Sequence, residues 1–276
     1  MPWFLPGGPP SAGVLVVLAV ALVLAAAAQD GRTAERAPFD AEGDVERGRA
    51  VVVGVYAGAT PHGERGVGPA GGACFSCHGL NGKGDAAAVV PRLAGQAPAY
   101  LYKALKDYAA GARQNAVMTP IAQALTEREM RDVAVYYAAQ TGAPYDDPPE
   151  VDLELLQHGA MLAAIGSTER GIQGCVNCHG PDGSGIFPSY PSLAGQSASY
   201  SEAQLRAWQR GHRKGDPLAV MEMIARRMTD EDVRAVAAFY ASIRPRSAEA
   251  QTAPGRTSVD ALPPAFAPDP ASIGRR

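Results

Sequence analysis

Cysteine and histidine are scarce in this sequence of 276 residues, which has only four cysteines and five histidines. All four cysteines fall inside two short motifs, so none is left for a structural disulfide, and an oxidising compartment has to be inferred from other features. The formal net charge of -3 provides no basic surface of the kind that nucleic-acid-binding proteins carry. With 31 glycines and 23 prolines, the chain is expected to contain many loops, and helices are favoured over a large sheet.

Only one long apolar run is present, AGVLVVLAVALVLAAAA at residues 12–28. As a helix it would measure roughly 25 Å, which is short of the ~30 Å hydrocarbon core of a bilayer, and its three final alanines offer a cleavage site of small residues. No Lys or Arg precedes the run, although signal peptides usually have one there. We predict a signal peptide at residues 1–28 and a periplasmic protein. An uncleaved N-terminal membrane anchor is the alternative.

Two copies of one motif carry the chemistry, CFSCHG at residues 74–79 and CVNCHG at residues 175–180. Cys-x-x-Cys-His is the attachment signature of c-type haem, because both thiols add to the haem vinyl groups and the adjacent histidine can bind the iron. A zinc knuckle would need further ligands, and the other histidines, His62, His158 and His212, are not placed equivalently. A thioredoxin-like pair should lie beside a βαβ pattern, which this sequence lacks. We therefore predict two covalently bound haem c groups, held by Cys74, Cys77 and His78 and by Cys175, Cys178 and His179.

The similarity between the halves extends well beyond this motif. PRLAGQ at residues 91–96 corresponds to PSLAGQ at 191–196, and Arg113 corresponds to Arg213 at the same offset of 100. The chain is thus predicted to be all-α, with tandem domains at residues 44–141 and 152–245, an acidic linker rich in proline at 142–151, and a disordered Pro/Ala-rich tail at 246–276. Three helices are expected in each copy: 44–57 and 152–165, 98–110 and 199–210, and a last helix capped by Thr126 or Thr229.

The duplication also selects a sixth iron ligand for each site. Met118 follows His78 by 40 residues and lies just before Pro120, whereas Met130 fits the core face of the last helix. Aligning residues 121–127 with 224–230 maps Met118 onto Met221. Methionine ligation raises the reduction potential of a haem. We predict Met118 and Met221 as ligands, with Met223 as the alternative in the second copy.

With these residues in place, the sequence resembles a dihaem class I cytochrome c of the cytochrome c4 type over residues 44–245. The resemblance implies two class I domains packed through a pseudo-twofold interface. It also implies that the carbonyl groups of Pro91 and Pro191 accept hydrogen bonds from the Nδ1–H of His78 and His179. The partners would be redox proteins, either a terminal oxidase that takes electrons or a dehydrogenase that supplies them. The segment at residues 58–72 is longer than its counterpart in the second half, and the C-terminal tail is extra.

The expected function is electron transfer without catalysis, because histidine and methionine at both irons leave no open position for a substrate. The alternative is the cytochrome subunit of a dehydrogenase complex, in which the same two haems would be the outlet for electrons. A dihaem peroxidase would need one iron that can open, and matching methionines in both copies disfavour it. Nucleic acid is not an expected partner.

Overall fold

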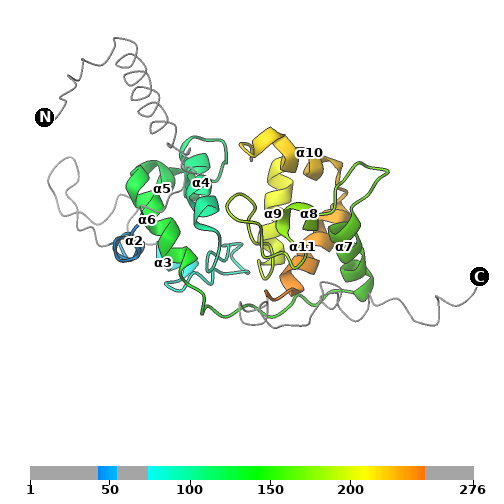
Figure 1. The fold of residues 1–276 in the computed structure, drawn as a ribbon, viewed down its shortest axis with the longest axis horizontal. Helices are drawn as coiled ribbons and strands as arrows, with labels where there is room; N and C mark the ends of the chain where they lie inside the picture. The colour runs from blue at the N-terminus through cyan, green and yellow to red at the C-terminus, as the bar shows by residue number, and fades with distance from the viewer. Residues whose placement is uncertain (1–42, 55–73, 246–276) are drawn as a thin grey trace, which may run out of the picture. The chain divides into compact units, whose positions relative to one another are not determined.

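The computed structural model describes residues 43–54 and 74–245, which belong to one compact unit of the chain. These residues form helices and loops, with isolated β-bridges but no strand among them (Figure 1). The predicted signal peptide, the 58–72 segment, the tail and His62 lie outside the described residues. Of the helices in the described ranges, none is long and apolar enough to cross a membrane.

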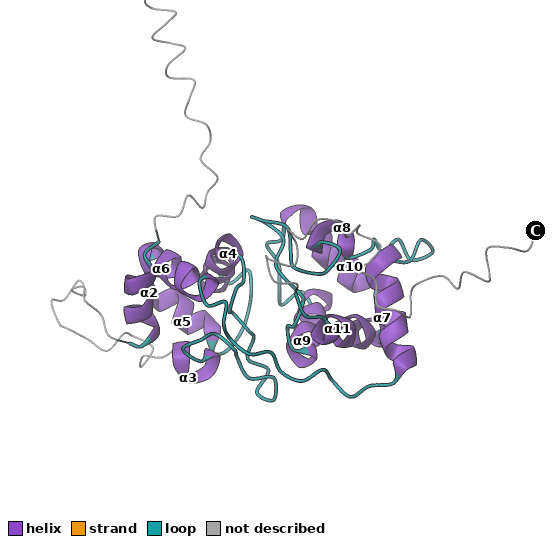
Figure 2. Ribbon diagram, turned by 60° about the horizontal axis from the view of Figure 1, so that its bottom comes forward, coloured by secondary structure: helices purple, strands orange, loops and turns teal. Residues whose placement is uncertain are grey.

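Within residues 43–54 and 74–245, each repeat shows five α-helices in the same order, joined by long loops (Figure 2). The first repeat contains α2 (Val45–Val52), α3 (Cys74–His78), α4 (Pro98–Ala109), α5 (Met118–Ala124) and α6 (Glu127–Ala138). The second contains α7 (Leu153–Ile165), α8 (Val176–His179), α9 (Ala198–Gln209), α10 (Val220–Arg227) and α11 (Asp230–Ser242), with the 3₁₀ turn η1 (Pro217–Ala219) before α10. The predicted bounds agree within one residue for α4, α7 and α9, and α6 and α11 begin after the predicted threonine caps. Helix α2 ends at Val52, earlier than the predicted residue 57. The short helices α5 and α10 were not predicted.

The first and last helices of each repeat cross at a glycine. Helix α2 packs on α6, and α7 packs on α11. A Cβ atom at Gly48 would lie 2.1 Å from the carbonyl oxygen of Asp132, and one at Gly159 would lie 2.1 Å from that of Ala235. Glycine is therefore needed at both crossings, because any side chain would separate the two backbones.

The last helix of each repeat begins at the predicted threonine. Thr126 forms a capping box with Glu129, and Thr229 forms one with Asp232. Both motifs satisfy amide groups that a helix N-terminus leaves without partners. They fix the start of α6 and α11, whose inner faces supply much of the buried core.

The two repeats pair through their backbones in a reciprocal way. Arg113 and Arg213 form an antiparallel bridge. The amide of Gln114 donates to the carbonyl of His212 (2.8 Å), and the amide of Lys214 donates to the carbonyl of Ala112 (2.7 Å). Each repeat thus donates one backbone hydrogen bond to the other, as expected when two copies are related by a twofold axis. This agrees with the pseudo-twofold interface that the resemblance implied.

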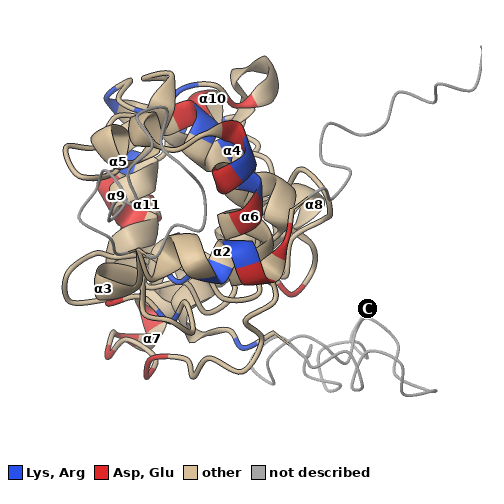
Figure 3. Cartoon of the chain, turned by 90° about the vertical axis from the view of Figure 1, so that its left-hand side faces the viewer, with Lys and Arg blue, Asp and Glu red and all other residues tan. Residues whose placement is uncertain are grey.

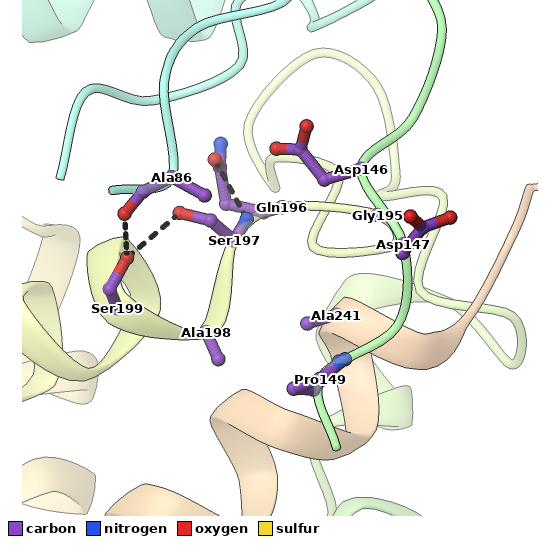
Figure 4. A pocket seen from close by; sticks show the side chains of 10 residues that line it. All are labelled: Ala86, Asp146, Asp147, Pro149, Gly195, Gln196, Ser197, Ala198, Ser199 and Ala241. Carbon is purple, nitrogen blue, oxygen red and sulfur yellow. Dashed lines mark hydrogen bonds between the residues drawn. The ribbon is translucent and has the colours of Figure 1, made fainter. Parts of the chain in front are cut away.

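The predicted linker is fastened to both repeats. Arg92 donates to the carbonyls of Pro144 (2.8 Å) and Ala143 (2.9 Å). The ring of Tyr145 lies 4.0 Å from the guanidinium of Arg92 and 5.1 Å from that of Arg244. We call Arg92, Tyr145 and Arg244 the linker clasp, because together they join the first repeat to the end of the second. The linker also lines a cavity of about 250 Å³ beside the start of α9 (Figure 4).

Charged residues of both signs are interspersed along the helices. In the view of Figure 3, basic and acidic segments alternate along α2, α4 and α6. Ion pairs one helical turn apart join Lys103 to Asp107 (2.5 Å) and Arg226 to Glu222 (2.7 Å). This mixture differs from the basic stripe that is typical of nucleic-acid-binding proteins.

Candidate functional site

Each Cys-x-x-Cys-His motif forms a single helical turn that ends at a buried histidine. The side chains of His78 and His179 are both 6% exposed. Their Nδ1–H groups donate to the carbonyls of Pro91 (3.1 Å) and Pro191 (2.8 Å), as the resemblance implied. A carbonyl oxygen can only accept, so the ring proton lies on Nδ1 and the Nε2 lone pair is available to a metal. Burial lowers the pKa of both histidines, and the carbonyl contact offsets this only in part. The neutral ring that a metal ligand requires is therefore favoured.

None of the four cysteines forms a disulfide. Burial raises the pKa of Cys175 to about 11 and also raises the pKa of Cys74. Reactive cysteines in thiol oxidoreductases have a lowered pKa, because the thiolate is the nucleophile. The first cysteine of each motif thus lacks the lowered pKa of a thioredoxin-like site.

The predicted methionine ligands lie at the beginning of the two helices that the sequence did not reveal. Met118 is the first residue of α5, and its amide donates to Oδ1 of Asn115 (2.8 Å). Met221 is the second residue of α10, and its amide donates to Oδ2 of Asp216 (2.6 Å). An acidic or amide side chain from the preceding loop thus fixes the backbone at both methionines.

The competing methionines occupy different environments. Met223 is 44% exposed, whereas Met221 packs against the buried cluster of the second repeat, which Cys175 also contacts. Met130 is 4% exposed and lies in the core, as expected for packing. Met228 is buried in the same cluster as Met221. Of the methionines on α10, Met221 is therefore the better candidate.

Two buried arginines meet at the interface between the repeats. Arg113 donates to the hydroxyl of Tyr200 (2.5 Å), and Arg213 donates to the hydroxyl of Tyr100 (3.1 Å), so each reaches the opposite repeat. The guanidinium of Arg213 also lies 3.8 Å from the ring centroid of Trp208. Burial alone would raise the pKa of Tyr100, but the charges of Arg213 and Arg113 outweigh it and lower this pKa to about 8. Sequence comparison paired these residues by their offset but did not indicate that they would meet.

Among the described residues, two buried side-chain N–H groups have no hydrogen-bond acceptor. The Nε of Arg113 and the Nε1 of Trp208 are buried, and neither has a hydrogen-bond partner. Within the described part of the chain, no carboxylate forms an ion pair with Arg113 or Arg213. Buried cations without counter-ions are costly. An anionic group at this place would satisfy them.

The residues present therefore fit a c-type haem. Each repeat offers two thiols for thioether bonds, a neutral histidine with Nε2 free, and a methionine in the following loop-helix segment. The unpaired donors and the two arginines suit the carboxylates that haem carries on its edge. The chemistry of this donor set was foreseeable from the motifs. The interface arginines were not, because they are distant from the motifs in sequence.

Comparison with known proteins agrees with this description. The family model described as cytochrome c matches residues 64–138 and 169–244. The thiosulfate dehydrogenase electron acceptor of Stutzerimonas stutzeri (strain A1501) is 47% identical over 180 residues, which cover 64% of this chain and 82% of that protein.

Two solved structures extend the comparison. Reduced recombinant cytochrome c4 from Pseudomonas stutzeri has a TM-score of 0.61 at 28% identity, and the match covers 73% of this chain and all of that one. Thiosulfate dehydrogenase from Marichromatium purpuratum has a TM-score of 0.63 at 38% identity, and the match covers 80% of this chain. The match spans only 44% of that longer chain.

Proposed function

Because this chain belongs to the cytochrome c family and is a dihaem electron carrier of the cytochrome c4 kind, we propose that it accepts electrons from a thiosulfate-oxidising dehydrogenase. The observation that carries this choice of donor is sequence identity. The chain is more similar to a protein named as a thiosulfate dehydrogenase electron acceptor than to the cytochrome c4 of known structure. The similarity to a solved thiosulfate dehydrogenase points the same way.

The proposed ligand sets are the ones predicted from the sequence. Cys74 and Cys77 form the thioether bonds of the first site, where His78 and Met118 bind the iron. The second site uses Cys175, Cys178, His179 and Met221. When bound, haem supplies a one-electron iron couple at each site. The chain's own residues hold the ring nitrogen neutral, orient it through Pro91 or Pro191, and provide buried donors for the haem carboxylates.

A histidine and a methionine at each iron would leave no position open for a substrate, so we propose that the protein has no catalytic activity of its own. Electrons would enter and leave during brief contacts with protein partners. Small, transient interfaces are typical of such encounters. Carbon monoxide binding to the reduced protein, or rapid turnover of peroxide, would reveal an open iron and contradict this proposal.

The haem attachment and ligation can be tested separately from the donor. The mass of the denatured protein, after maturation in an oxidising compartment, is expected to exceed that of the chain by two haems. Met118→Ala and Met221→Ala should each remove about half of the weak thioether-to-iron absorption band and lower the potential of one haem. Met223→Ala is the matched control and should leave the band intact. The reverse result for Met221 and Met223 would show that the alignment is wrong.

The donor is tested by mixing the oxidised protein with thiosulfate and a thiosulfate dehydrogenase while the haem spectrum is followed. Reduction is expected only when both enzyme and thiosulfate are present. Reduction by thiosulfate alone, or no reduction with the enzyme present, would contradict the proposed donor. If the protein then transferred electrons readily to a terminal oxidase, the carrier function would stand and only the identity of its donor would change.

We further propose that the protein acts in the periplasm after cleavage behind Ala28. The support is the apolar run at residues 12–28, which lies outside the described residues. N-terminal sequencing of the mature protein should give Gln29 first. A chain that begins at Met1 and stays with the membrane after a salt wash would favour the anchor.

A further inference from the structure

Two buried glutamines cross between the repeats. Gln96 and Gln196 end the shared Leu-Ala-Gly-Gln motif and are 7% and 8% exposed. The Oε1 of Gln196 accepts from the amide of Arg92 (3.0 Å), and its Nε2 donates to the carbonyl of Arg92 (3.0 Å). Gln96 makes the same two bonds with Ser192, at 2.8 Å and 2.9 Å.

These bonds reach the peptide groups that orient the histidines. The amide of Arg92 belongs to the same peptide unit as the carbonyl of Pro91, which accepts from His78. The amide of Ser192 likewise belongs to the unit of the Pro191 carbonyl, which accepts from His179. Each proximal histidine is thus connected, through one peptide group, to a glutamine of the opposite repeat.

The glutamines are themselves fixed by their own helices. The Oε1 of Gln196 also accepts from the amide of Ser197 (3.2 Å), at the start of α9, a contact that Figure 4 shows. The Oε1 of Gln96 accepts from the amide of Ala97 (3.0 Å), at the start of α4. The amide oxygen and nitrogen of both side chains are therefore paired, and their orientation is set without freedom to rotate away.

We propose that Gln196 is a positioning residue for His78, and Gln96 for His179, so that each repeat adjusts the electron density on the iron ligand of the other. The physical basis is the polarisation of a peptide group. When a glutamine oxygen accepts from the N–H, electron density rises on the carbonyl oxygen of the same peptide, and that oxygen becomes a better acceptor. The effect is stronger in a buried, low-dielectric site.

The consequence for the histidine has a definite sign. A stronger acceptor at Nδ1–H makes the imidazole more electron-rich and a better ligand. An electron-rich ligand stabilises the oxidised iron, so the glutamine of one repeat lowers the potential of the haem in the other. This inference rests on the ligation by His78 and His179 that is proposed above.

The test uses the full-length dihaem protein carrying Gln196→Leu or Gln96→Leu. We expect Gln196→Leu to raise the midpoint potential of the haem bound at Cys74 and Cys77 more than that of the other haem. Gln96→Leu should give the mirror image. The two haems are assigned by following their histidine resonances by nuclear magnetic resonance through a redox titration.

A second readout follows the hydrogen bond itself. In the reduced protein labelled with ¹⁵N-histidine, the Nδ1–H proton of His78 should move to lower chemical shift in Gln196→Leu, because its hydrogen bond is weaker. The proton of His179 should move in Gln96→Leu. Gln196→Asn keeps the side-chain amide but shortens the side chain by one methylene group. It should change the midpoint potential and the chemical shift in the same directions, and it serves as a second variant if the leucine substitution prevents folding.

Gln209→Leu is the matched control. Gln209 donates to the carbonyls of Ala225 (3.0 Å) and Met228 (3.1 Å). Its substitution removes a glutamine of the second repeat but leaves intact the hydrogen bonds to the two peptide groups that orient the histidines. It should produce no crossed shift. The inference is overturned if Gln196→Leu shifts both haems equally, as a loosened interface would, if it mainly affects the haem of its own repeat, or if it affects neither. The mass of the attached haems, measured on the same samples, distinguishes these results from a failure of the proposed function.

Discussion

Replacing Gly159 by alanine is expected to destabilise the second repeat by forcing α7 away from α11. The new Cβ would lie 2.1 Å from the carbonyl oxygen of Ala235 and 2.5 Å from its carbonyl carbon. Backbone stands on both sides of the contact, so no change of rotamer can relieve it. Overpacking of this kind costs about 3 kcal/mol. Alanine recovers about 1 kcal/mol because it favours the helix more than glycine does. The net loss is about 2 kcal/mol.

A loss of this size should be visible in thermal unfolding. For a domain of this length, about 2 kcal/mol corresponds to a fall of roughly 10 °C in the midpoint of the transition. Calorimetry and far-ultraviolet circular dichroism of the haem-loaded protein would measure it. Gly142→Ala is the control, because nothing lies within 4 Å of a Cβ at that position. If the Gly159 variant unfolded at or above the temperature of the control, helix propensity alone would govern the site and the reasoning from the close approach would be refuted.

Two further substitutions test features outside the haem ligands. Burial would raise the pKa of Asp232, but hydrogen bonds from Arg170, Thr229 and His158 outweigh it and hold this pKa well below its usual value of 3.8. Its stabilisation is therefore present above that value and is lost as the pH falls below it, so Asp232→Asn should lower the free energy of unfolding by about 2 kcal/mol at neutral pH, and the difference should shrink in acid. A difference that grew on acidification, measured by urea unfolding across this range, would contradict the assignment. Tyr145→Ala should open the linker clasp and speed cleavage by a glutamate- and aspartate-specific protease within residues 146–150; an unchanged rate would mean that the arginine contacts hold the linker without the ring.

The sequence predicted the elements that have a local signature. Helices α4 and α9 follow the repeated Leu-Ala-Gly-Gln motif, and α6 and α11 begin after threonines followed three residues later by an acid, which form capping boxes. The family model and the solved cytochrome c4 structure confirm the all-α fold, the two cytochrome c domains and the haem. These features could be predicted because a motif of fixed spacing that appears twice is specific. The predicted ligand set remains a prediction.

The short helices were missed for physical reasons. Helix α5 has only seven residues and includes Pro120, and its N-cap residue, Val117, has no polar side chain that would mark a helix start in the sequence. Helix α10 follows residues Leu218 and Ala219 in a left-handed conformation, which non-glycine residues rarely adopt and no pattern predicts.

The glutamine contacts were also beyond sequence reasoning. The motif that ends in Gln96 was noticed only because it recurs. The Gln96 side chain binds a backbone group 96 residues away in the sequence. Because every residue has the same backbone groups, the residue type at that position does not reveal the contact. The contact of the His158 side chain with buried Asp232 (2.8 Å) was also not predicted, because the two residues lie 74 positions apart in the sequence.

The reciprocal contacts between the repeats are those that a symmetric homodimer would make, but here both halves are encoded in one chain. In a homodimer every substitution appears twice, whereas here a contact can change on one side alone. Arg92 and Ser192 hold the same backbone position opposite a glutamine, yet Arg92 reaches the linker and Ser192 donates to the carbonyl of Gly183 (3.3 Å). Covalent fusion also keeps the halves at an effective concentration on the order of millimolar. A polar interface that separate subunits could lose on dilution therefore persists at any protein concentration, and the separation between the two redox centres persists with it.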